Sequence, residues 1–155
     1  MEKVSVRKCE DYERAKEADK LWFSDLGGIH IPGGSKVLIK TNLLKMNKAK
    51  DMVTTHPKVI EAVISCLQEE GINDIIIADS PGGPFNSALL KGVYAMSGIE
   101  EVAKKKGVKL NYDTGSTDVF NKEGVILKHF TICDFVRNVD VVIDCAKLKT
   151  HQMTG

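Results

Sequence analysis

The chain has 155 residues, of which 43% are hydrophobic and 28% are charged, as in ordinary globular proteins. These values exclude a disordered tail, a collagen-like fibre and a coiled coil, and the length predicts a single domain spanning residues 1–155. The net charge of +1 gives no general attraction to nucleic acid or to acidic membranes. We therefore expect neither of them as a partner, and any site for an anion must be local.

The cysteine spacing argues against a metal cofactor bound within the chain. Cys9, Cys66, Cys133 and Cys145 are far apart and form no C-x-x-C pair, so neither a zinc site nor an iron–sulfur cluster is expected among them. Reduced thiols fit this pattern. The sequence also shows no apolar leader and no apolar stretch long enough to span a membrane. We therefore expect a cytoplasmic protein.

Apolar periodicity predicts strands and helices that alternate along the chain. In chain order, the pattern gives a strand around 4–6, a helix over 12–26, a strand at 37–39, a helix over 57–71 and a strand at 75–78. It continues with helices over 86–94 and 97–107, a strand at 108–112, a β-hairpin of 117–120 and 125–130, a short helix at 134–137 and a strand at 139–143. Pro57 suits a helix start, and Ser97 with Glu100 has the spacing of a capping box.

This alternation predicts an α/β fold. We expect an open, mostly parallel, doubly wound (Rossmann-like) sheet with helices on both faces and a β-hairpin insertion. A parallel strand at 139–143 requires a crossover helix after it, and too few residues follow to build one. The sequence therefore predicts the N-terminal part of a longer protein.

Polar residues follow three of the predicted strands. Because the carboxyl ends of parallel strands meet at one edge of a sheet, these residues are expected to form a site for a small phosphorylated or carboxylated metabolite. Lys147 and Lys149 alternate by two, so in extended chain they point the same way and can clamp one anion. The expected ligand-binding residues are Lys40, Asn42, Thr55, His56, Ser80, Gly82, Gly83, Lys147, Lys149 and Thr150. Asp79 and His151 are the predicted acid–base residues.

Each of these residues also has a purely structural interpretation. Asp79 can form an Asx-type turn, and Thr55 or His56 can cap the helix that begins at Pro57. His56, Asp79 and His151 could together hold a metal ion, although they lack a signature spacing. Neither a P-loop nor a dinucleotide-binding fingerprint occurs in the sequence.

Four short segments resemble the domain of unknown function family 362. In chain order they are Lys40-Thr41-Asn42-Leu43-Leu44, Thr54-Thr55-His56-Pro57, Asp79-Ser80-Pro81-Gly82-Gly83-Pro84 and Lys147-Leu148-Lys149-Thr150-His151. The resemblance implies an uncharacterised α/β domain, whose longer members frequently add a ferredoxin-like module that holds two 4Fe-4S clusters. Thr41 stands where the family usually has proline, and a later segment containing Lys-Asn is missing.

These observations give one leading hypothesis and two alternatives. The first is an enzyme domain that binds a small anionic metabolite and, as the resemblance implies, is linked to a ferredoxin-like iron–sulfur domain outside this chain. The second is a non-catalytic module that binds a ligand or a partner within an iron–sulfur protein. The third is a metal-dependent enzyme that uses His56, Asp79 and His151.

Overall fold

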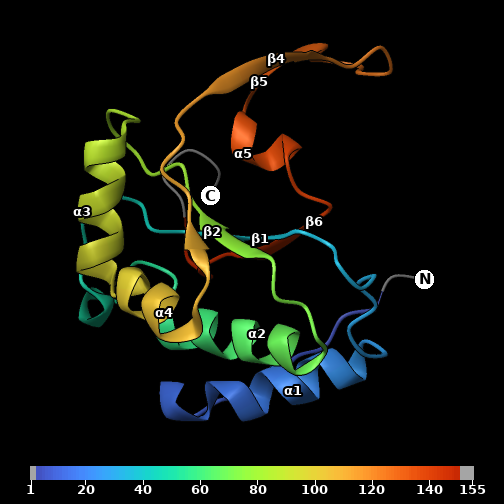
Figure 1. The fold of residues 1–155 in the computed structure, drawn as a ribbon, viewed down its shortest axis with the longest axis vertical. Helices are drawn as coiled ribbons and strands as arrows, with labels where there is room; N and C mark the ends of the chain where they lie inside the picture. The colour runs from blue at the N-terminus through green and yellow to red at the C-terminus, as the bar shows by residue number, and fades with distance from the viewer. Residues whose placement is uncertain (1–2, 151–155) are drawn as a thin grey trace.

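Figure 1 shows a computed structural model of the chain, which describes residues 3–150. Its central sheet has four parallel strands in the order β3-β2-β1-β6. The strands are β1 (Val37–Thr41), β2 (Ile75–Ala78), β3 (Lys109–Leu110) and β6 (Val141–Cys145). The sheet is flanked by helices, so the α/β prediction is confirmed.

The longer helices gather on the sheet face that carries Ile39 and Ile77. They are α1 (Ala15–Asp25), α2 (Pro57–Glu69), α3 (Ser87–Ser97) and α4 (Ile99–Lys106), with one-turn 3-10 helices at Tyr12–Arg14 and Ala49–Asp51. Ile60 and Leu67 of α2 are fully buried in one cluster with these strand residues, and α1 packs against α2. Alternate residues of each strand therefore form the main hydrophobic core.

The opposite face of the sheet is covered by a much shorter element. Phe135 of α5 (Asp134–Arg137) packs against Leu38 and Ala78 there. Because both Ile39 and its neighbour Leu38 are fully buried, β1 is apolar on both faces, which is the pattern of a central parallel strand.

Two antiparallel strands form a separate ribbon that projects from the sheet in Figure 1, β4 (Ser116–Phe120) and β5 (His129–Cys133). The second of these strands was expected at 125–130, and that position is wrong. The register pairs Phe120 with His129, so the apolar residues 125–127 fall in the connecting loop. Val125 and Ile126 are 96% and 91% exposed, which shows that an apolar run alone does not make a strand.

Two other local predictions are also wrong. Residues 4–6 form no strand, and Val4 and Val6 are largely exposed. Ser97 does not cap α4, because it is the last residue of α3 and its hydroxyl donates to the carbonyl of Tyr94. Gly98 takes the N-cap position with φ +79°, a left-handed conformation that glycine adopts without a steric penalty.

The start of α2 is as expected, with His56 at the N-cap and Pro57 in the first turn. Within residues 3–150, none of the helices has the length and hydropathy needed to cross a membrane.

The central strand is expected to carry much of the stability. Ile39 is fully buried, so Ile39→Ala should lower the free energy of unfolding by about 2–5 kcal/mol through lost burial and the cavity left behind. The matched control is Val142→Ala on the edge strand β6, where the side chain is 47% exposed and the loss should stay below about 1 kcal/mol. Urea denaturation measures both, and equal losses would contradict the assignment of the core.

Candidate functional site

The strand register brings three strand ends together. Lys40 of β1 lies opposite Ala78, the last residue of β2, and Thr41 lies opposite Cys145, the last residue of β6. The residues that follow these strands therefore leave the sheet at the same edge, which is where ligands bind in open parallel sheets.

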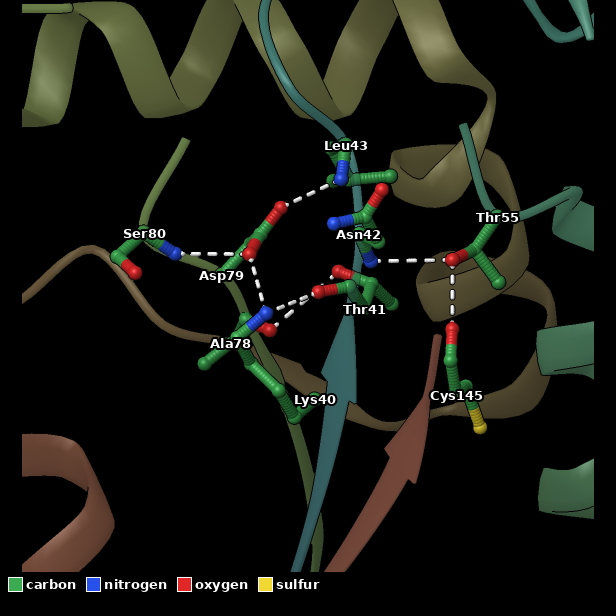
Figure 2. A network of polar contacts seen from close by, with 9 residues as sticks. All are labelled: Lys40, Thr41, Asn42, Leu43, Thr55, Ala78, Asp79, Ser80 and Cys145. Carbon is green, nitrogen blue, oxygen red and sulfur yellow. Dashed lines mark hydrogen bonds and ion pairs between the residues drawn. The ribbon is translucent and has the colours of Figure 1, made fainter. Parts of the chain in front are cut away.

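The first cluster at this edge surrounds the carboxylate of Asp79, as Figure 2 shows. Lys40 Nζ lies 2.7 Å from Asp79 Oδ1, and the backbone N–H of Ser80 donates to the same oxygen at 2.9 Å. The backbone N–H of Leu43 donates to Oδ2 at 2.6 Å. Asp79 is only 3% exposed, so three donors compensate a charge that is almost removed from water. Both carboxylate oxygens are thus occupied by the protein itself.

Lys40 is held in place by the same cluster. Besides Asp79, its ammonium group donates to the backbone carbonyl of Thr41. The Thr41 hydroxyl in turn donates to the carbonyl of Ala78 at 3.3 Å, across the β1–β2 pair. Lys40 is therefore an ion-pair partner in the structure, and its charge is already neutralised by a neighbouring carboxylate.

Thr55 connects the ends of two strands to the start of α2. Its hydroxyl donates to the carbonyl of Cys145 at 2.6 Å and accepts from the N–H of Asn42 at 3.0 Å. Its own N–H donates to the carbonyl of Asn42 at 2.9 Å. The side-chain Oδ1 of Asn42 is buried and has no hydrogen-bond partner within the described residues. The hydrogen-bonding capacity of Thr55, by contrast, is fully used.

The second cluster joins His56, Tyr12 and Lys147. The rings of Tyr12 and His56 stack with centroids 3.7 Å apart, and Lys147 Nζ donates to the Tyr12 hydroxyl at 3.0 Å. Burial, and then the positive charges of Lys147 and Lys58, hold the pKa of His56 below its usual value. The imidazole is therefore neutral at neutral pH. Its Nδ1 accepts from the N–H of Lys58 at 3.2 Å, which leaves the ring proton on Nε2.

The glycine-rich loop after β2 is used in a packing contact. The N–H of Gly82 donates to the carbonyl of Leu44 at 2.6 Å, and a side chain at this position would lie close to that carbonyl. Gly83 has φ +108°, a conformation that favours glycine. Ser80 contributes its backbone N–H to Asp79, and its side chain is exposed.

The last predicted site residues are less constrained. Lys149 and Thr150 lie in exposed, irregular chain after β6, and His151 lies outside the described residues. Of the proposed metal ligands, Asp79 and His56 belong to the two different clusters. Among residues 3–150, no group of three or more His, Cys, Asp or Glu side chains is placed to hold a metal ion.

Tyr12 is the residue of this edge that the sequence did not reveal. Its spacing assigns it to the apolar face of the first helix, and it lies instead in the 3-10 turn before α1. Nothing in the sequence links it to His56 or to Lys147, which is 135 residues away.

The fold and this edge define an α/β protein with polar clusters at the carboxyl ends of its parallel strands. Residues 37–155 match the family described as Domain of unknown function (DUF362), and the chain belongs to this family. The resemblance of its four segments to that family is thereby confirmed.

A curated relative is the Thylakoid-associated protein sll1697 of Synechocystis sp., which is 30% identical over 158 aligned residues. The alignment covers 96% of this chain and 45% of the relative, so the chain spans less than half the length of that protein. No solved structure matches the chain with significance.

Asp79→Asn is expected to destabilise the fold more than Lys40→Met. The amide can offer only one acceptor oxygen, and its NH₂ group faces a backbone N–H, so the variant should lose about 3–5 kcal/mol, as for a broken buried ion pair. Lys40→Met leaves both backbone N–H groups on the carboxylate and should cost less, because Lys40 itself is partly exposed. Urea denaturation at neutral pH ranks the two variants, and the reverse order would contradict the anchoring role of Asp79.

Proposed function

We propose that the carboxyl edge of the sheet binds a small anionic ligand, a phosphorylated or carboxylated metabolite, as part of an enzyme domain. The observation that carries this proposal is the ammonium group of Lys147 beside the N-terminus of α2. Among residues 3–150 it has no carboxylate partner and its charge lowers the pKa of His56, whereas Lys58 is paired with Glu13. The dipole of α2 adds a partial positive charge to this place, although the N–H groups of Lys58 and Val59 already donate to His56.

The two clusters have different roles in this proposal. Lys147 and the Nε2–H of His56 would contact the anion, and Lys149 and Thr150 would approach it from the exposed chain after β6. The other predicted binding residues at this edge would support the site indirectly, through contacts within the protein. They are Lys40, Thr55, Ser80, Gly82 and Gly83. The buried Oδ1 of Asn42 would accept from a hydroxyl or amine of the ligand.

For catalysis, Asp79 is a positioning residue in this proposal, because its two oxygens already accept from three donors. Proton transfer then falls to the imidazole groups of His56 and His151. A neutral imidazole can accept a proton on one ring nitrogen and donate one from the other.

The link to an iron–sulfur domain remains part of the proposal. The four cysteines lie at separate places in the described structure and offer no cluster ligand set, so a ferredoxin-like domain would have to supply one from outside this chain. Within the proposal, residues 1–155 form one domain at the N-terminal side of a longer cytoplasmic protein, with the sheet doubly wound.

The anion site is tested by the titration of His56. Inorganic phosphate bound at Lys147 should raise the pKa of His56, because a nearby negative charge favours the imidazolium form. We expect this rise in the native chain and in the control Lys122→Gln, whose site lies in the β4–β5 loop. In Lys147→Gln the pKa should be higher without phosphate and should no longer respond to it. NMR of the imidazole Cε1–H measures each value, with sodium chloride of equal ionic strength as the reference.

Two outcomes would contradict the anion site. One is a His56 pKa that phosphate leaves unchanged in the native chain. The other is a phosphate response of full size in Lys147→Gln.

A second candidate function is contact with a membrane surface. The loop between β4 and β5 presents three consecutive aliphatic residues, Val125, Ile126 and Leu127, which are 96%, 91% and 62% exposed. Lys122 and Lys128 flank them, and the ribbon projects away from the sheet. Apolar side chains between lysines suit the boundary between lipid headgroups and acyl chains. The Synechocystis relative is named as thylakoid-associated, which is consistent with this function.

Replacing the tip by Val125→Ser, Ile126→Ser and Leu127→Ser should abolish co-sedimentation with phosphatidylglycerol vesicles. The control is Val4→Ser with Val6→Ser, which removes equally exposed aliphatic side chains from the N-terminal segment and should leave binding unchanged. Sedimentation of the tip variant to the same extent as the native chain would exclude the loop as the contact, and so would a native chain that stays in the supernatant.

A further inference from the structure

A cavity of about 940 Å³ lies beside the edge strand β6, and the N-terminal segment, α1 and α2 also line it. This volume is within the range of small-molecule sites. Apolar side chains from separate elements line much of it, among them Trp22 of α1, Val59 and Val63 of α2, and Ile143 of β6. The cavity can therefore bury an apolar body of a ligand.

Asp19 is an acidic residue of this lining with a buried oxygen that has no partner among residues 3–150. Asp19 projects from α1 into the wall of the cavity, and its Oδ2 is removed from solvent without a hydrogen bond to any described residue. Burial raises the pKa of Asp19 to about 6, so the carboxyl group is still mostly ionised at neutral pH. A buried anionic oxygen without a donor is costly, and a donor group supplied by a ligand would remove that cost.

The charges around the cavity favour a cation. Asp11 and Asp144 line it together with Asp19, and so does Glu10, which is paired with Lys8. The basic side chain of the lining is Arg7, and both ends of its guanidinium fork are bound to Asp25. The lining therefore has an excess of negative charge, which repels carboxylates and phosphates and attracts ammonium groups.

We propose that this cavity binds a small organic ammonium compound, with its apolar body against Trp22 and Val63 and its protonated amine on the carboxylate of Asp19. Tyr12 lines this cavity and also belongs to the Lys147 cluster, so the two places adjoin. The cavity has the opposite charge preference, and its proposal does not depend on the proposed anion site. It would give the domain a second ligand, of a different chemical class from the first.

The cavity contains its own spectroscopic probe. Trp22 is the single tryptophan of the chain, so its fluorescence reports directly on ligands that enter this cavity. Three probes share one apolar body and differ in the head group: phenethylamine, phenethyl alcohol and 3-phenylpropanoate. We expect the amine to bind about tenfold more tightly than the alcohol and the carboxylate to bind most weakly, because a charged hydrogen bond to Asp19 is worth more than a neutral one.

Asp19→Asn should lower the affinity for phenethylamine about tenfold and leave that for phenethyl alcohol nearly unchanged, since the substitution removes the charge but keeps the size. Glu17→Gln is the matched control, because it removes an exposed carboxylate from the same helix and should alter neither affinity. Ala18→Phe fills the cavity from α1 and should weaken all three probes, which tests the location independently of Asp19.

Three results would overturn the proposal. They are equal affinities for the three probes in the native chain, an unchanged affinity for phenethylamine in Asp19→Asn, and full binding of the amine in Ala18→Phe. Calorimetry of the native chain with phenethylamine serves as the second measurement, and an absence of heat together with an absence of fluorescence change would also reject the site. None of these results would bear on the phosphate response of His56.

Discussion

The carboxyl edge of the sheet depends on one buried carboxylate. Asp79 is almost entirely removed from water, and a charge in that position is tolerated only when donors replace the lost hydration. The donors come from three places: the side chain of Lys40 in β1, the N–H of Leu43 in the next loop and the N–H of Ser80 after β2. The electrostatic requirement of Asp79 therefore fixes both loops relative to the two central strands.

This requirement separates the polar groups of the edge into two sets. Lys40 forms an ion pair with Asp79. The hydroxyl of Thr55 both donates and accepts a hydrogen bond with backbone groups, which connects β1, β6 and the start of α2. Among residues 3–150, Lys147 donates to the neutral phenol of Tyr12 and has no carboxylate partner, and its charge lowers the pKa of His56. A rigid interior with an uncompensated cation at its rim is the arrangement that electrostatic preorganisation requires. The proposed anion site therefore depends on the difference between Lys40, which has a carboxylate partner, and Lys147, which has none among the described residues.

The apolar pattern within a single segment was enough to predict most helices and strands. Contacts between distant segments could not be predicted in this way. The unbroken run Ile75-Ile76-Ile77 and the apolar face that follows Pro57 each identify one element without reference to the rest of the chain, and parallel strands necessarily bring their ends to one edge. The sequence does not indicate that Asp79 accepts a hydrogen bond from the N–H of Leu43, 36 residues away. Its role as an anchor is therefore invisible in the sequence, and so is the contact of Tyr12 with His56. The position of β5 was predicted wrongly for the same reason. The residues that form a strand in a hairpin depend on how the two strands pair, which one segment alone does not show.

Asp19 shows how a local inconsistency in the sequence can point to function. On a helix, Ala15, Asp19 and Trp22 are spaced by four and three residues, so an acidic residue occupies the face that packs toward the protein. Ala15 is buried on this face, and Trp22 and Asp19 both line the cavity beside β6. Stability alone would favour an apolar residue at position 19, because an ionised oxygen without a donor opposes folding. Residues that oppose folding in this way occur mainly at functional sites. The cavity that Asp19 lines is large enough to admit a small ligand.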